Sequence, residues 1–261
     1  MPCCNARAML STLLRQLLPG SCLLCDGATG SRPDLDLCPE CLAALPWNEP
    51  ACQRCANPLP GRSDDSLCGI CRAAPPPFTR TLAPLTYDSF PRRWITRLKD
   101  QLGMVEGRIL GTLLADAVAA HYAGAAAAGH PIPEVIVPVP LSLRRLARRG
   151  HNQALTLARP VARRLGLGIA RHAVVRARPG HRQRGLSRLQ RLENPAGIFA
   201  ARRTWGDAGP CLAIVDDVMT TGSTAAELAR VLLAAGAGEV HVWCAARTPI
   251  RLPGPSPAPG S

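Results

Sequence analysis

Two adjacent aspartates and a group of hydroxyl side chains stand close together near the carboxyl end of the chain. Asp216 and Asp217 follow a short apolar run, residues 212–215, that is typical of a strand buried on both faces. A hydroxyl-rich turn comes next, and residues 225–235 after it favour a helix. A strand that leads into a helix in this way directs backbone N–H groups and the positive end of the helix dipole at one place, where a phosphate can bind.

The chemistry of this turn indicates a sugar phosphate. Its residues are Thr220, Thr221, Gly222, Ser223 and Thr224. The glycine permits a positive φ or the close approach of a ligand, and the hydroxyls add donors. The two acids would repel a phosphate, so we assign them to the hydroxyls of an attached sugar or to a bridging Mg²⁺. The sequence therefore predicts a ribose-5-phosphate site. The alternative is a helix capped by Ser223 or Thr224, which gives the acids no role.

A second loop with phosphate-binding chemistry follows another predicted buried strand, residues 135–137. The loop, residues 138–143, contains Pro138, Val139, Pro140 and Leu141. Four arginines come after it: Arg144, Arg145, Arg148 and Arg149. Because guanidinium groups present forked donors to phosphate, this loop is suited to a diphosphate. The alternative is a basic helix face exposed to water.

Eight of the 12 cysteines form an internal repeat with the spacing of a metal site. The unit C-x2-C-x12-C-x2-C occurs twice, shifted by 30 positions, at Cys22, Cys25, Cys38, Cys41 and at Cys52, Cys55, Cys68, Cys71. Two C-x-x-C pairs complete a tetrahedral four-sulfur site for Zn²⁺. We expect two structural zinc ions that are bound sequentially, four cysteines to each repeat. Interleaved pairing is the alternative within the zinc model, and disulfides would require an export signal that the sequence does not show.

The remaining cysteines do not extend this pattern. Cys211 and Cys244 lie in apolar, strand-like runs, and we expect buried thiols. We expect Cys3 and Cys4 to be an unstructured terminal pair, with a ligand role as the alternative.

The basic charge is concentrated in one part of the chain. The net charge is +13, and residues 144–203 contain sixteen arginines and one acid, Glu193. Such a segment creates a positive field that attracts polyphosphate or nucleic acid. An arginine-rich, solvated surface is the alternative. Aromatic residues make up 3% of the chain, which argues against a surface that stacks bases.

The order of the motifs predicts a small metal-bound unit followed by an α/β domain. We expect an N-terminal helix at 1–20, a double zinc ribbon at 21–74, an α/β domain at 78–248 and a disordered tail at 249–261. The boundary lies at three consecutive prolines, residues 75–77. No stretch is long and apolar enough to span a membrane and no secretion signal is visible, so we expect a cytoplasmic protein.

Strands and helices alternate within the second unit, which predicts a mainly parallel sheet with ligands at the carboxyl ends of its strands. The expected strands are 81–87, 135–137, 212–215 and 239–246. The expected helices are 92–101, 106–122, 153–165 and 225–235, with a loose connector at 123–129. Residues 176–194 are polar and long for a connector, as mobile lids and binding loops often are.

These motifs together resemble the ComF family, in which a double zinc ribbon is joined to a type I phosphoribosyltransferase domain. The resemblance runs from about residue 22 to residue 248, and it is strongest at 215–224, 137–140, 149–154 and 183–194. It implies that Asp216 and Asp217 hold the ribose hydroxyls of phosphoribosyl pyrophosphate (PRPP), residues 220–224 its 5-phosphate and loop 138–143 its pyrophosphate, with Mg²⁺ bound alongside. Residues 176–194 would be the flexible catalytic loop, with lid or nucleic-acid contacts at Arg182, Gln183, Arg184, Arg188 and Arg191.

The chain departs from the family pattern in two places. His151 stands where the family usually has an aromatic residue, and residues 179–182 replace a threonine-rich stretch. The second departure concerns the contacts of the lid and leaves the predicted fold unchanged. The resemblance also implies a role in natural competence, the uptake of single-stranded DNA by bacteria, with a helicase-like protein as a partner.

Three functions are compatible with these features. A binding protein for PRPP and single-stranded DNA accounts for the arginine-rich segment and for both loops. A PRPP-dependent transferase would work by positioning and charge stabilisation, but no acceptor pocket or catalytic residue can be identified in the sequence. A regulator that senses PRPP or a nucleotide is the third.

Overall fold

The computed structural model describes residues 20–29, 32, 34–61, 66–100, 103–127, 131–176, 197–206 and 209–250. Residues 1–19 of the helix predicted at 1–20, with Cys3 and Cys4, lie outside this part of the chain. So do residues 177–194 of the lid predicted at 176–194 and residues 251–261 of the tail predicted at 249–261.

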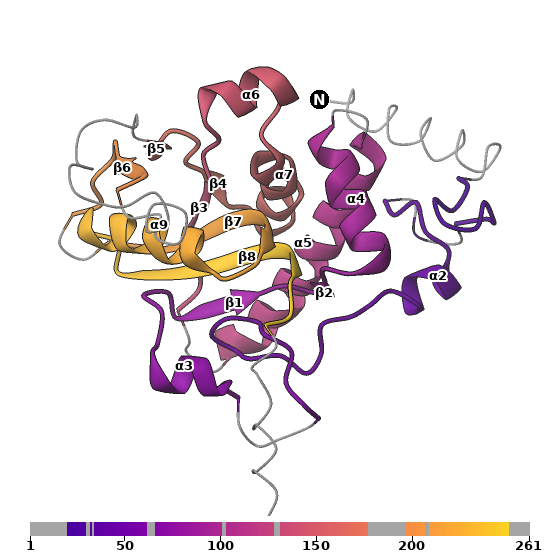
Figure 1. Ribbon diagram of the computed structural model, residues 1–261, viewed down its shortest axis with the longest axis horizontal. Coiled ribbons are helices and arrows are strands. Elements are labelled where there is room, and N and C mark those ends of the chain that lie inside the picture. Colours follow the sequence, from indigo (N-terminus) through magenta and orange to yellow (C-terminus); the bar gives the residue numbers. More distant parts are fainter. Residues whose placement is uncertain are drawn as a thin grey trace, which may run out of the picture.

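A six-stranded sheet forms the centre of the structure, and all of its pairs are parallel (Figure 1). The strands are β1 (Arg80–Leu82), β2 (Leu85–Thr86), β3 (Val135–Pro138), β4 (Gly168–Ile169), β7 (Cys211–Met219) and β8 (Glu239–Arg247). Their order is β1-β8-β7-β3-β4, and β2 also pairs with β8. A separate antiparallel pair joins β5 (Val174–Arg176) to β6 (Phe199–Ala201). The predicted α/β fold with a parallel sheet is confirmed.

Helices cover both faces of the sheet, which is why its central strands are almost wholly apolar. On one face α5 (Met104–Ala127) and α7 (Gln153–Leu165) pack on the strands, with α4 (Ser89–Lys99) packed against α5. On the other face α9 (Ser223–Ala234) covers β7 and β8 (Figure 1). The side chains of β7 alternate between two cores, with Val215 on the α5 side and Ile214 on the α9 side.

The predicted end of β7 is wrong. The sequence placed it at Val215, before the two acids, but the strand continues through Asp216 and Asp217 to Met219. The strand continues because β7 remains paired with β8: Asp216 lies opposite Cys244 and Met219 opposite Arg247. The two acids therefore lie on the strand itself and not in the turn.

Other boundaries also differ from the prediction. The expected strand 81–87 is divided into β1 and β2 at Ala83 and Pro84, because proline lacks the N–H that a ladder needs. Helix α4 begins at Ser89, whose N–H donates to the carboxylate of Asp88 at 2.7 Å. Residues 123–127 of the expected connector belong to α5. Helix α7 begins and ends where predicted, with Asn152 as its N-cap.

Each cysteine repeat contains one short helix, and the two helices obey the same shift of thirty residues. Helix α2 (Pro39–Ala43) begins directly after Cys38, and α3 (Gly69–Ala73) directly after Cys68. Figure 1 shows α3 below β1 and α2 on the side of α4. The two repeats therefore dock on different parts of the α/β domain.

Helix α6 (Leu143–Arg149) follows the loop after β3 and has no buried residue. It rises above the carboxyl end of the sheet (Figure 1). Of the helices described, none combines the length and apolar character that crossing a bilayer requires.

Candidate functional site

Loop 138–143 begins beside β7, the strand that leads to the turn 220–224. Pro138 lies opposite Val215 in the ladder, and the N–H of Val139 donates to the carbonyl of Val215 at 2.9 Å. The side chain of Asn152 donates to the carbonyl of Val139 at 3.1 Å, which ties the loop to the start of α7. Loop 138–143 therefore begins directly beside the strand that carries the acids.

The turn after β7 has the shape of an anion cradle. Gly222 has φ +82°, a left-handed conformation that suits glycine, and α9 starts at the next residue. The hydroxyl of Thr221 accepts from the N–H of Ser223 at 3.3 Å and lies 3.0 Å from its hydroxyl. The N-cap, Gly222, provides no side-chain cap, so capping by Ser223 or Thr224 does not explain the turn. The N–H groups of a first helical turn have no acceptor within the helix, and they can face a ligand.

The acids bend back onto the backbone beside this turn. A carboxylate oxygen of Asp216 accepts from the N–H of Asp217, and one of Asp217 accepts from the N–H of Val218, both at 2.8 Å. Burial, together with the neighbouring charge of Asp217, raises the pKa of Asp216 to about 8. Near neutral pH the ligand-free protein therefore keeps a proton on Asp216.

Lys99 is a site residue that reasoning from sequence missed. It is the only lysine in the chain and the last residue of α4. Its Nζ lies 3.0 Å from Oδ2 of Asp217. This cation partly offsets the paired acids and brings a donor to the strand that carries them. The sequence shows that this is the single lysine among 31 basic residues, but not that it lies beside Asp217.

The predicted arginines separate into different groups. Arg144 and Arg145 are exposed on α6. Arg149 is turned inward and donates to the side chain of Gln153 at 2.9 Å, so the expectation that it faces a ligand does not fit this conformation. Arg176, at the start of the predicted lid, donates to the carbonyl of Pro140 at 3.2 Å and packs over the ring of Phe199. Arg182, Gln183, Arg184, Arg188 and Arg191 lie outside the described residues.

Charged groups on α6 and β7 affect the pKa of Arg176. Burial and the charge of Arg145 lower its pKa, and the carboxyl of Asp216 opposes that shift. A partly buried cation therefore lies within electrostatic reach of the acid on β7 while it bonds to the loop after β3.

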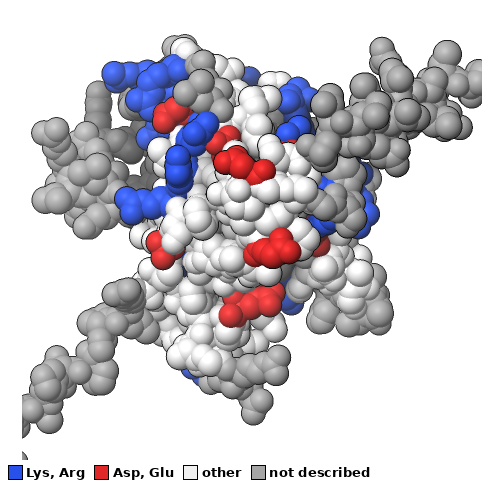
Figure 2. Space-filling model, turned by 90° about the vertical axis from the view of Figure 1, so that its right-hand side faces the viewer, with Lys and Arg blue, Asp and Glu red and all other residues white. Residues whose placement is uncertain are grey.

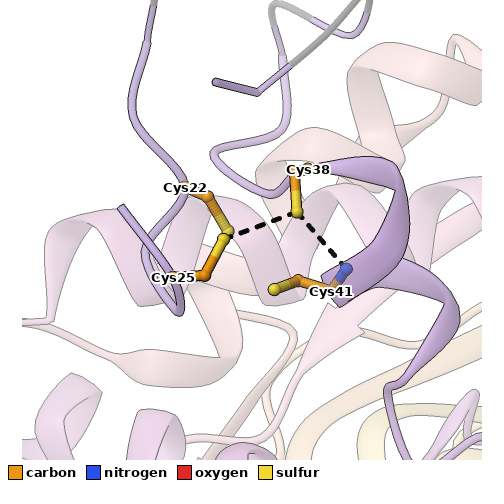
Figure 3. Close-up of side chains that lie close together, drawn as sticks. All are labelled: Cys22, Cys25, Cys38 and Cys41. Atoms are coloured by element: carbon orange, nitrogen blue, oxygen red, sulfur yellow. Dashed lines mark hydrogen bonds between the residues drawn. The ribbon is translucent and has the colours of Figure 1, made fainter. Parts of the chain in front are cut away.

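The eight ribbon cysteines gather into two groups of four, in the sequential arrangement that the repeat predicts. Within Cys22, Cys25, Cys38 and Cys41, and within Cys52, Cys55, Cys68 and Cys71, the sulfur atoms all lie within 4.8 Å of one another. The Sγ atoms of Cys25 and Cys38 are 3.6 Å apart, as are those of Cys55 and Cys68 (Figure 3 shows the first group). This is far beyond a disulfide bond of about 2.05 Å. It matches the roughly 3.8 Å between thiolates placed tetrahedrally around zinc at about 2.3 Å.

Backbone donors make these groups suited to a metal. The N–H of Cys41 donates to Sγ of Cys38 at 3.4 Å, and the N–H of Cys68 to Sγ of Cys52 at 3.3 Å. Burial alone would raise the pKa of Cys22, but N–H donors led by that of Cys38 lower it to about 6. The same balance brings the pKa of Cys52 to about 7. In each group one thiol therefore ionises readily, whereas hydrogen bonds from its neighbours raise the pKa of Cys41, and burial raises the pKa values of Cys55 and Cys71. Zn²⁺ would displace the protons of these remaining thiols.

Cys211 and Cys244 are buried thiols, as expected. Cys211 lies with Glu239 and His241 in a third group of possible metal ligands. In this group the imidazole of His241 is already bonded on both sides, to Glu239 at 2.9 Å and to the hydroxyl of Tyr122 at 2.5 Å. These hydrogen bonds satisfy the buried ring and tie β8 to α5, so a structural role accounts for the cluster.

The fold and the cysteine groups define a class: a double zinc ribbon joined to an α/β domain with a parallel sheet. The family model of the double zinc ribbon domain matches residues 13–73. The DNA utilization protein YhgH of Salmonella typhi is 34% identical over 232 residues, which cover 88% of this chain and 98% of that protein. The competence protein F of Haemophilus influenzae is 39% identical over 119 residues, 44% of this chain and 51% of that protein. The chain belongs to the ComF family, which contains both of these proteins.

Among solved structures, the glutamine phosphoribosylpyrophosphate amidotransferase of B. subtilis, complexed with ADP and GMP, is similar with a TM-score of 0.34 and 19% identity. The match covers 58% of this chain and 26% of that one. A similarity at this level carries no argument about ligands.

Proposed function

We propose that the protein binds PRPP, or a related ribose-5-phosphate ligand, at the carboxyl edge of β3 and β7, and that it acts on single-stranded DNA. The observation that carries the first part is that loop 138–143 begins beside β7, which carries Asp216 and Asp217 and leads through the turn 220–224 into α9. The N–H groups that begin α9 are suited to the 5-phosphate and the acids to the ribose hydroxyls.

The diphosphate end of PRPP fits the cations near the carboxyl edge of β3 and β7. Lys99 and Arg176 supply positive charge beside Asp217 and Pro140. A Mg²⁺ ion bound to the diphosphate would add to that charge, since Mg²⁺ is usually held through substrate phosphates and a few carboxylates. We therefore propose that PRPP binds together with Mg²⁺.

Calorimetry tests this part directly. PRPP with Mg²⁺ is titrated into the zinc-loaded protein and into Asp216→Asn/Asp217→Asn, with Glu49→Gln, an exposed acid between the cysteine groups, as the control. We expect binding by the wild type and by the control, and at least a tenfold loss of affinity in the double variant. A wild type that shows no heat of binding would falsify the ribose-phosphate assignment.

The DNA part of the proposal depends on the location of basic charge. The names of the relatives refer to DNA utilization and to competence. In this chain the arginine-rich segment 144–203 begins at α6, whose Arg144 and Arg145 are exposed after loop 138–143. Figure 2 shows the side on which α2 and α4 lie, and its described surface carries both acidic and basic side chains. We therefore place the phosphate backbone contacts at the exposed arginines of α6.

A labelled single-stranded oligonucleotide provides the test. Its affinity should fall steeply with salt, because neutralised phosphates release counterions. Arg144→Gln/Arg145→Gln should weaken binding and flatten the salt dependence, whereas Arg92→Gln/Arg93→Gln, a matched exposed pair on α4, should change neither. A flat salt profile in the wild type would contradict the proposal.

Catalysis is a second prediction, based on the resemblance to transferases. Release of pyrophosphate from PRPP in the presence of candidate bases would establish it.

The helicase-like partner is likewise a prediction from the resemblance, to be tested by a binding experiment with a purified helicase.

A further inference from the structure

One buried arginine connects the second cysteine group to the proposed phosphate loop. Arg247 is the last residue of β8, and 1% of it is exposed. Its Nε donates to the carbonyl of Cys55 at 2.8 Å. Its Nη1 donates to the carbonyls of Met219 at 3.0 Å and Thr248 at 2.5 Å, and also to that of Thr220. One side chain thus bonds to a metal ligand of the second group and to the two residues that precede Thr221.

Within the part of the chain that the structure describes, no carboxylate pairs with this guanidinium. None of the ion pairs found among the described residues includes Arg247. A buried, unpaired charge costs several kcal/mol unless polar groups surround it, so the carbonyl oxygens carry the compensation. The carbonyl of Cys55 is held in place in return, because it is the acceptor of the buried Nε–H. The carbonyls of Met219, Thr220 and Thr248 share the two N–H groups of Nη1 and are drawn toward the same charge.

Packing reinforces this connection from the same side. Ala56, which follows the metal ligand Cys55, belongs to the core that contains Phe78 and Met219. A methyl group placed on Gly222 would lie 3.9 Å from the ring of Phe78 and 3.7 Å from the sulfur of Met219, so the turn rests on this core. The carbonyl of Gln53 also accepts from the N–H of Thr81 at 3.0 Å, which joins the first knuckle of this group to the edge of the sheet.

The first cysteine group has a different attachment. Among the described residues its segment is held by ion pairs to α5, from Arg32 to Asp116 at 2.7 Å and from Arg108 to Asp36. Leu35 and Leu37 pack into the core on the α5 side of the sheet, opposite α9. None of the hydrogen bonds or ion pairs found for its described residues reaches residues 219–224.

We propose that the second cysteine group, acting through Arg247 as a positioning residue, sets the conformation of the phosphate loop. Zinc in this group fixes the turn from Cys52 to Cys55 and with it the carbonyl that anchors the guanidinium. Arg247 then holds the carbonyls of Met219 and Thr220, so that the N–H groups that follow face the ligand. The ligand half of this inference rests on the proposed function, and the structural half does not.

The structural half is tested by hydrogen exchange of the full-length, zinc-loaded protein. Cys68→Ser/Cys71→Ser removes the second metal, and Cys38→Ser/Cys41→Ser is the matched control from the other repeat, with zinc content measured for each. We expect amides in residues 219–224 to exchange at least tenfold faster in the first variant and at the wild-type rate in the second. Equal acceleration in both variants, or none in either, would overturn the proposal.

Arg247 itself is tested with both zincs in place. Arg247→Met should accelerate exchange at residues 219–224 while zinc content stays at two per chain. Because that variant leaves a cavity and could fail to fold, Arg247→Lys is the second variant, since it keeps the charge but loses the fork that reaches two segments. We expect faster loop exchange in Arg247→Lys as well. A wild-type rate in Arg247→Lys would overturn the role of the fork.

The part of the inference that concerns the ligand is tested by thermodynamic linkage between zinc binding and PRPP binding. If zinc and PRPP favour the same loop conformation, each must strengthen the binding of the other by the same factor. We expect PRPP with Mg²⁺ to slow the transfer of one zinc of two to a chromophoric chelator, and Arg247→Lys to remove this effect. If the wild type binds no PRPP, the proposed function fails while the exchange result stands. If it binds PRPP and both zincs leave at unchanged rates, the coupling fails.

Discussion

The two cysteine repeats have the same spacing, but they lie in different surroundings. In the first, Cys25 is exposed and Cys41 is half-buried, whereas all four cysteines of the second are buried. The first is attached to α5 by Arg32 and Arg108, whose side chains are 40% and 53% exposed. The second is attached to the sheet by the buried Arg247 and by backbone hydrogen bonds at its edge.

This difference shows what a repeat in sequence specifies and what it leaves open. The spacing C-x2-C-x12-C-x2-C fixes four sulfur atoms around one point, and it does so twice. Docking is decided by residues outside the motif, such as Arg247, almost two hundred positions after Cys55 in the chain. Exposed ion pairs contribute about 0–1 kcal/mol each, and hydrogen bonds to a charged group about 1.5–3 kcal/mol. The second repeat is therefore coupled to the phosphate loop by hydrogen bonds to a buried charge, whereas the first is held by exposed ion pairs and by Leu35 and Leu37 in the core.

The largest expected effect of this difference is on global stability. We predict that Cys52→Ser/Cys55→Ser lowers Tm by about 6–12 °C, the shift that a loss of about 3 kcal/mol produces in a protein of this size. Cys22→Ser/Cys25→Ser should lower it by less than half as much, because Cys25 is exposed and Cys41 half-buried, so that loss of the first metal leaves fewer buried thiols without a partner. Calorimetry with zinc analysis measures both. A larger loss in the first-group variant would reverse the comparison.

Much of the candidate site could be predicted from local sequence, because its parts are local. The cysteine groups, the turn 220–224 and the loop after β3 depend on spacing within short segments. The strand end was placed too early, since two charged residues look like a strand end when the partner β8 is not known. Lys99 and Arg247 could not be placed at all, because their contacts with Asp217, Cys55 and Thr220 exist only after folding.

Near the phosphate loop, the charge of Asp216 destabilises the folded protein, and the first repeat has no such effect. Asp216 has a pKa of about 8, raised first by burial and then by Asp217, against 3.8 in its ordinary state. The folded protein thus binds this proton more tightly than the unfolded chain, and stability is lost as pH rises from about 4 to about 8. Above that range the loss is complete.

We therefore predict that Asp216→Asn stabilises the ligand-free protein. Its Tm should exceed that of the wild type by about 2–4 °C at pH 8.5, the shift expected for about 1 kcal/mol, and by less at pH 5. Comparing the two proteins at each pH cancels the pH dependence of the zinc sites. A difference in Tm that stays constant between pH 5 and pH 8.5 would show that the charge of Asp216 is not its cause.

The smallest expected effect concerns the ion pairs that attach the first repeat. Arg108→Gln removes the pair with Asp36, in which Nε lies 3.0 Å from the carboxylate. Because the arginine is exposed, we expect a loss below about 1 kcal/mol that disappears at high salt. Hydrogen exchange of residues 34–42 should quicken in the variant at low salt and in the wild type at 1 M salt.

Residues 52–59 of the second repeat should be unchanged in both cases, since their anchors are buried and hardly screened by salt. If salt loosens the two repeats equally, their attachments do not differ in kind, and the stability difference predicted for the cysteine variants would then arise from burial of the metal groups alone.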